Sequence, residues 1–139
     1  MEEMPPYASV ENLQRLRVYQ LARELSKLVW QAVKEWNFET RKHLGDQWVR
    51  ATDSISANIA EGYGRFFFND SIKFYYYARG SLFEFYDWLA KAQERGLLTE
   101  QQSQALKAQS EDLPKELNTL IKRTRTNSQH FVNNKSINQ

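Results

Sequence analysis

The sequence predicts an all-α protein that folds as an antiparallel up-down-up-down four-helix bundle, and three observations support this fold class. Four segments of roughly 20 to 27 residues carry apolar side chains at steps of three and four, the spacing of a helix with one buried face. Short connectors separate these segments, which favours antiparallel neighbours. No segment alternates apolar and polar residues as a half-buried strand does.

The chain has 139 residues, which suits one domain with a sizeable core. We expect three parts, namely a flexible N-terminal lead over 1–9, the bundle over 10–125, and a disordered polar tail over 126–139. The lead is short and contains two prolines, and the tail is rich in Asn, Ser and Gln without apolar periodicity.

The first helix is expected to run from Ser9 to about Trp36. The Ser9 hydroxyl can accept a hydrogen bond from a free backbone N–H in the first turn, as an N-cap does. The apolar stripe has the spacing of bundle packing and consists of Val18, Ala22, Leu25, Val29, Ala32 and Trp36.

The second helix, capped by Asn37 or Thr40, is expected to be central and to end at Gly62 and Gly64. Small residues on a second face, over 54–60, would let another helix come close. Its buried stripe should consist of Leu44, Trp48, Ala51, Ile55, Ile59 and Gly62.

The third helix should follow a loop with three aromatic residues, Phe66, Phe67 and Phe68, which either form a contact surface or cover the end of the bundle. Asn69, Asp70 or Ser71 would cap this helix, and Gly96 would end it. It carries two apolar stripes, so we expect another subunit to cover part of it. The stripes are Tyr75, Ala78, Leu82, Phe85, Leu89 and Ala92, and Ile72, Tyr76, Phe83, Tyr86 and Ala90.

The fourth helix begins with a capping box, Thr99 with Gln102, and Pro114 predicts a kink or break within it. Its inner face should consist of Leu106, Leu113, Leu117, Leu120 and Ile121.

Composition excludes several classes of function. The chain has no Cys and only two His, so a cysteine zinc site or a His-rich metal site is not expected. Asp46 and Asp53 lie seven apart, a spacing that equally suits solvated residues or intersubunit salt bridges. We therefore expect no enzyme and no cofactor. Since no signal peptide or membrane span is recognisable, we expect a cytoplasmic protein without a membrane partner.

Several charges lie within otherwise apolar helical stripes and would need partners if buried. A structural network joining the second and third helices is the preferred interpretation, and a ligand or anion site is the alternative. Gly80, beside one of these charges, suggests a close helix crossing there. The network residues are Arg50, Glu61, Arg65, Arg79 and Glu84.

The net charge of +2 does not by itself indicate nucleic-acid binding, but the C-terminal end is locally basic. From Lys115 onward a single acid, Glu116, accompanies five basic residues, which suits either a solvated helix end or a phosphate-binding surface. The candidate nucleic-acid-binding residues are Arg15, Arg17, Lys34, Arg41, Lys42, Lys122, Arg123 and Arg125.

Several segments together resemble a bacterial family of four-helix-bundle proteins encoded by intervening sequences inside large-subunit ribosomal RNA genes. The resemblance covers about 13–120. It lies in Leu16–Ala22, Arg50–Ala51, Ser54–Ile55, Asn58–Arg65 and Ala78–Leu82, together with Glu84.

This resemblance implies a ring-like homopentamer and a similarity to the accessory proteins of diversity-generating retroelements, which bind nucleic acid and a reverse transcriptase. The first hypothesis is therefore a non-enzymatic homo-oligomeric module that binds RNA, DNA or a nucleic-acid-processing partner. The alternative is an oligomeric scaffold for protein partners that binds no nucleic acid.

Overall fold

A computed structural model describes residues 8–137, and these residues are helical apart from short connectors, with no strand among them. The prediction of an all-α protein is confirmed. Of the expected flexible lead, residues 1–7 lie outside the described part. The helices are α1 (Val10–Arg15), α2 (Arg17–Val33), α3 (Phe38–Thr40), the π-helix η1 (Arg41–Gly45), α4 (Asp46–Tyr63), α5 (Phe68–Glu94), α6 (Glu100–Ser110) and α7 (Leu113–Ile137).

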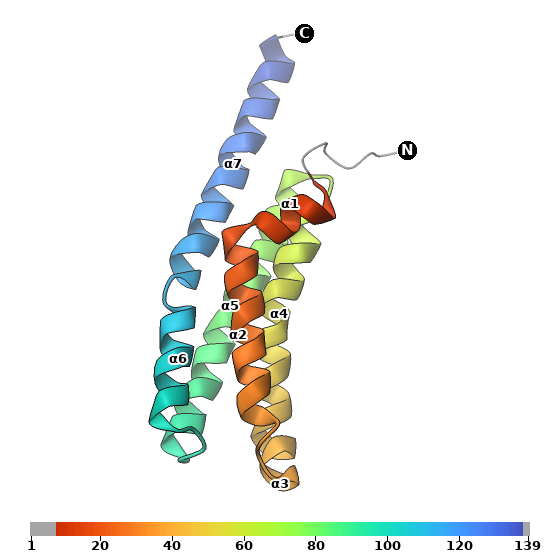
Figure 1. The fold of residues 1–139 in the computed structure, drawn as a ribbon. Helices are drawn as coiled ribbons and strands as arrows, with labels where there is room; N and C mark the ends of the chain where they lie inside the picture. Colours follow the sequence, from red (N-terminus) through yellow and green to blue (C-terminus); the bar gives the residue numbers. More distant parts are fainter. Residues whose placement is uncertain (1–7, 138–139) are drawn as a thin grey trace.

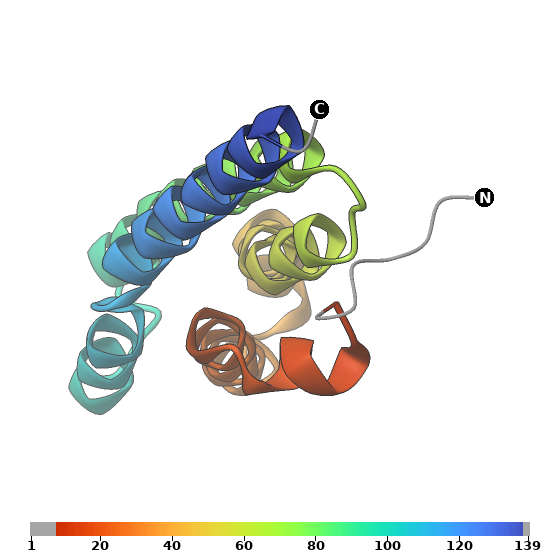
Figure 2. The same cartoon turned by 90° about the horizontal axis from the view of Figure 1, so that it is seen from above.

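The long helices lie side by side, and successive ones run in opposite directions (Figure 1). Helix α4 packs on α5 over the largest contact and on α2 with its other side. Helix α5 also packs on α7, and α2 packs on α6 (Figure 2). The prediction that the second helix is central is therefore confirmed.

The core is built around Trp48, whose side chain is fully buried. Its ring stacks on Trp36 from the connector after α2 and on Phe85 from α5, with ring centroids 5.9 and 6.0 Å away. Every residue of the predicted α4 stripe is buried, as are the first α5 stripe and the inner face of the fourth helix. Each large apolar side chain buried in this way contributes about 1.5–3 kcal/mol.

The first predicted helix is divided at Leu16, which has an extended backbone (ψ 122°). Ser9 caps α1 as predicted, its hydroxyl oxygen accepting from the Asn12 N–H at 3.1 Å. The break lets α1 lie across the end of the long helices (Figure 1). Leu13 and Leu16 are thereby partly buried against the core, which a straight continuation of α2 would not achieve.

The second helix begins with the predicted Asn37 cap, whose side-chain oxygen accepts from the Thr40 N–H at 2.9 Å. It then passes through the π-helical turn η1 before α4, a feature that the apolar spacing did not predict. A Cβ on Gly45 would lie 2.7 Å from Val33 Cγ1. The end of α2 and η1 are therefore in close contact.

The predicted caps of the third helix are wrong, because α5 begins at Phe68 after an extended Phe67. Ser71 is buried, and its hydroxyl donates to the Phe67 carbonyl at 3.3 Å. Phe66 and Phe67 are exposed and meet edge to face, with ring centroids 5.0 Å apart. This exposure contradicts the interpretation that Phe66 and Phe67 cover the bundle end, and a contact surface stays a prediction.

The second α5 stripe is only partly buried. Ile72 is buried and Tyr86 is half-buried, whereas Tyr76 and Phe83 are exposed. Coverage of part of this helix by another subunit stays a prediction.

The predicted capping box at Thr99 and Gln102 is confirmed by reciprocal hydrogen bonds of 3.0 and 3.1 Å. The predicted break near Pro114 is confirmed as well, since α6 ends at Ser110 and α7 begins at Leu113. Pro114 is the second residue of α7, a position where its missing N–H is tolerated.

The predicted disordered tail is wrong over 126–137, because α7 continues without interruption to Ile137. This segment contains no Pro or Gly to stop a helix. Once a helix is nucleated, each added residue forms one more backbone hydrogen bond. Residues 138–139 lie outside the described part.

Gly62 lets α4 and α5 approach each other closely. A Cβ at this position would lie 2.7 Å from Tyr75 Cε1 and 2.9 Å from the Ser71 carbonyl oxygen. Gly80 is different, because it is exposed and no described atom lies within 4 Å of a Cβ placed there. The close crossing predicted at Gly80 is therefore not made by any helix of this chain within the described residues.

Gly62→Ala should lower the free energy of unfolding by about 1–3 kcal/mol, because the added methyl group forces α4 away from α5. Gly80→Ala is the matched control and should raise the free energy of unfolding by about 0.5–1 kcal/mol, since Ala is the better helix former. Urea unfolding followed by circular dichroism measures both. Equal stability of the two variants would contradict the close approach at Gly62.

Candidate functional site

Three of the eight candidate nucleic-acid-binding residues come together on α7. Lys122, Arg123 and Arg125 are exposed, and none of them forms an ion pair within residues 8–137. Residues 117–139 include no Asp or Glu at all. This half of α7 therefore has an uncompensated positive charge.

Arg125 also reaches the neighbouring helix. Its Nη2 donates to the Tyr76 hydroxyl of α5 at 3.0 Å. On α5 itself, Lys73 Nζ lies 5.9 Å from the centroid of the Tyr77 ring. Cations and exposed aromatic rings are thus interleaved where α5 packs on α7.

The guanidinium group of Arg17 forms ion pairs with two acidic side chains. It donates to Asp112 at 2.9 Å and to Glu116 at 2.5 Å, and thereby ties the start of α2 to the start of α7. The hydrogen bond to Asp112 and the charge of Glu116 raise the pKa of Arg17 above its ordinary value. Arg17 is therefore a structural cation in this chain, whereas the neighbouring Arg15 is exposed at the end of α1.

Lys34, Arg41 and Lys42 lie at the opposite end of the molecule, around α3 (Figure 1). The structure thus distributes the predicted cations over separate surfaces rather than one. Of these three, Arg41 and Lys42 line a groove of about 860 Å³ between α2 and α4.

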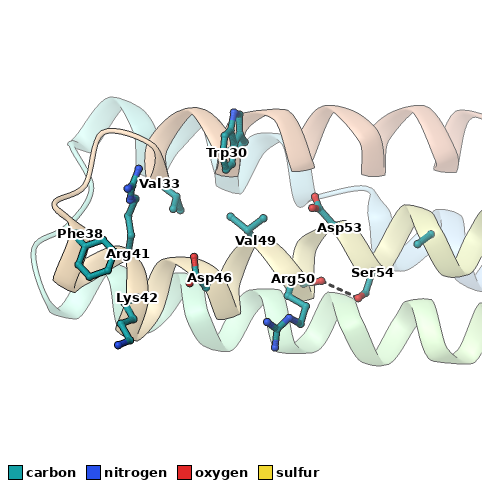
Figure 3. A pocket seen from close by; sticks show the side chains of 11 residues that line it. Trp30, Val33, Phe38, Arg41, Lys42, Asp46, Val49, Arg50, Asp53 and Ser54 are labelled. Carbon is teal, nitrogen blue, oxygen red and sulfur yellow. Dashed lines mark hydrogen bonds between the residues drawn. The ribbon is translucent and has the colours of Figure 1, made fainter.

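This groove has acidic, basic and apolar walls. Asp46, Val49 and Asp53 point from α4 toward α2, and Trp30 of α2 also lines the groove (Figure 3). Trp30 is 56% exposed and Phe38 is 73% exposed. Arg50 points away from α2, although it borders the groove (Figure 3). The groove has the mixed character of a protein-contact surface rather than that of a phosphate site.

The predicted polar network between the second and third helices is not formed within the described residues. Arg79 is exposed and lies over the ring of Phe83, 5.6 Å from its centroid, on its own helix. Arg65 and Glu61 pair at 2.6 Å one turn apart on the helix end, with both side chains about half exposed. Glu84 accepts from the Trp88 indole N–H at 3.3 Å, and Arg50 is exposed.

The network prediction was wrong because the apolar spacing does not separate a buried stripe from its exposed flank. Arg79 directly follows buried Ala78, but a single residue step turns a helix by about 100°. That rotation brings the Arg79 side chain to the surface.

The sequence reasoning missed Lys73 and Tyr77 and treated Tyr76 only as part of an apolar stripe. The spacing of four between Lys73 and Tyr77 was a usable signal, because residues four apart lie on the same helix face. The pairing of Tyr76 with Arg125 had no signal in the sequence, since 49 positions separate the two residues.

Within the described part of the chain, no group of three or more His, Cys, Asp or Glu side chains could hold a metal ion. In the same residues, no helix is both long and apolar enough to cross a membrane.

A comparison with known protein families identifies a match. A family model described as 23S rRNA-intervening sequence protein matches residues 14–119. No curated protein sequence matches the chain.

Arg79→Ala should change the free energy of unfolding by no more than about 0.5 kcal/mol, because the guanidinium is exposed and has no ion-pair partner in the described residues. Thermal unfolding measures this, with Arg65→Ala as the comparison, whose surface pair contributes about 0.3–0.5 kcal/mol. A loss near 3 kcal/mol for Arg79→Ala would mean that another subunit buries this side chain.

Proposed function

The chain belongs to the 23S rRNA-intervening sequence protein family, and from this membership we propose that it is a non-enzymatic homo-oligomeric module that binds RNA or DNA. The family match covers most of the chain, from 14 to 119, and so includes α2 to α6 and the first part of α7. In this proposal the module is a four-helix bundle. Helices α2, α4 and α5 supply three of its members, and α6 with α7 supplies the fourth.

The observation that carries nucleic-acid binding is the uncompensated charge of α7. Lys122, Arg123 and Arg125 are exposed and free of acidic partners in the described chain. Phosphate contacts need such free cations, because a paired cation must first give up its carboxylate. A net charge of only +2 per chain is compatible with nucleic-acid binding, because all Asp and Glu residues of the chain lie before residue 117.

Self-association is supported by large apolar side chains left uncovered beside the α2–α4 groove. Trp30 and Phe38 are more exposed than is usual for residues of their size, and a contact with another subunit would remove them from water. We propose a closed ring of five subunits, the number that the family resemblance implies. Such a ring repeats the α7 cations in each subunit and so raises the avidity for a long nucleic acid.

The second candidate function is an oligomeric scaffold for protein partners. The α2–α4 groove favours it, because Asp46, Asp53 and Arg41 place both signs of charge beside exposed apolar rings. An interface with a protein commonly combines such an apolar centre with a polar rim. Enzyme activity is not proposed, since the sequence offers no recognisable catalytic constellation.

Light scattering coupled to size exclusion tests the assembly. The protein at micromolar concentration should be a single oligomer, and Trp30→Asp combined with Phe38→Asp should dissociate it by burying charge at the contact. Circular dichroism should stay unchanged, because both side chains lie outside the core of one chain. A monodisperse monomer for the unchanged protein would contradict the ring.

Replacing Lys122, Arg123 and Arg125 by Gln should lower the affinity for every RNA or DNA tested by about ten-fold or more near 50 mM salt, and flatten its salt dependence. The reason is that fewer counterions are released when phosphate contacts are lost. Fluorescence anisotropy across a salt series measures both quantities.

A triple Gln variant at Lys27, Lys91 and Lys107 is the matched control. It removes the same charge from surfaces where Lys27 and Lys91 are paired with acids. This control should bind nucleic acid nearly as the unchanged protein does. If the unchanged protein binds no nucleic acid at low salt, the proposal fails and the protein scaffold is the better account.

A further inference from the structure

Six side chains on the first half of α5 and on its two neighbours, the end of α4 and α7, form what we call the cation–aromatic cluster. Arg65 Cζ lies 4.6 Å from the centroid of the Phe74 ring, and Phe74 meets Tyr77 edge to face at 5.5 Å. Lys73 lies over Tyr77, and Arg125 donates to the Tyr76 hydroxyl. The cluster therefore consists of Arg65, Lys73, Phe74, Tyr76, Tyr77 and Arg125.

The tyrosine rings of the cluster remain open to solvent. Tyr76 is 43% exposed and Tyr77 is 49% exposed, and the cation beside each ring leaves part of its surface free. Two further exposed rings, Phe66 and Phe67, lie in the connector just before α5. Exposed aromatic rings of this kind are costly in water and are typical of a surface that binds a partner.

The charge around these rings is positive on balance. Lys73 and Arg125 have no acidic partner in the described residues, and exposed Lys122 lies one turn from Arg125 on the surface of α7. The nearby acids are Glu61, which pairs with Arg65, and Asp70 in the first turn of α5. A polyanion approaching the rings therefore meets more cations than acids.

Resting on the proposed function, we infer that the cation–aromatic cluster binds single-stranded nucleic acid. Unpaired bases stack on the open faces of Tyr76 and Tyr77, while Lys73, Lys122 and Arg125 contact the phosphates on either side. Stacking of this kind tolerates any base, because every base has a flat π-face. The binding is therefore general in sequence but selective for unpaired strands.

A duplex does not use the cluster in the same way. Its bases are stacked on one another and present only their edges, so it meets the cations but not the rings. The affinity for nucleic acid therefore has two contributions. Phosphate contacts are shared by all nucleic acids, whereas base stacking is restricted to single strands.

A second exposed ring on α5 provides an internal comparison. Phe83 is 57% exposed and has Arg79 over its ring, so it resembles Tyr77 with Lys73. However, the exposed acids Glu84 and Asp87 flank it on the same helix. These acids repel phosphate, and we therefore assign no nucleic-acid contact to Phe83.

The test uses the full chain and two labelled probes, a polyuridine strand and an RNA duplex of equal length. Polyuridine should bind more tightly than the duplex. Tyr76→Leu combined with Tyr77→Leu should weaken polyuridine binding by about ten-fold or more without changing the affinity for the duplex. The salt dependence should stay the same, because the three phosphate-binding cations, Lys73, Lys122 and Arg125, remain.

Two further variants test whether a loss of polyuridine binding comes from the missing tyrosine rings or from a disturbed structure. Phe83→Leu should leave both affinities unchanged, and Tyr76→Phe should keep most of the polyuridine affinity because the ring remains. Circular dichroism and light scattering establish that each variant keeps its fold and assembly.

The outcomes separate this inference from the proposed function. If both probes bind equally and the double tyrosine variant binds polyuridine as the unchanged protein does, stacking is overturned while nucleic-acid binding by the cations stands. If neither probe binds at low salt, the proposed function and the inference fail together.

Discussion

The close packing of α4 against α2 and α5 is the constraint on which the rest of this structure depends. Trp48 stacks between rings from both neighbours, and Gly62 lets the backbone of α5 approach without a methyl group between them. Helix α5, held in this way, also packs on α7. The positions of Tyr76 and Arg125 therefore follow from contacts made in the core.

Most of the fold could be predicted from the sequence, because burial on one helix face leaves a regular spacing. The α4 stripe, the first α5 stripe, the Ser9 and Asn37 caps and the capping box at Thr99 all follow from local rules. The break at Leu16 and the π-helical turn η1 could not be predicted in the same way. Both depend on how a helix end packs against the core, and such tertiary contacts cannot be read from local spacing.

The candidate site was less predictable, since surface charge has no spacing rule of its own. Arg17 and Arg125 look alike in the sequence, but Arg17 binds two acids whereas Arg125 binds a tyrosine hydroxyl. Only the packing of α7 on its neighbours separates a structural cation from a free one. For the same reason the polar network around Arg79 was predicted across helices, although its contacts are local.

The uneven distribution of charge explains how a nearly neutral chain can still present a phosphate-binding surface. Acids offset cations in the first part of the chain, as Asp112 and Glu116 do for Arg17, while the stretch 117–139 includes no acid. Attraction at this range depends on charges within about 10 Å, the screening length near 0.1 M salt, and not on the net charge of the whole chain. Because Lys122, Arg123 and Arg125 lie within α7, the helix holds these cations at fixed positions relative to one another and to α5. The packing of α7 on α5 is thus the structural feature that gives this charge a defined position beside the exposed ring of Tyr76.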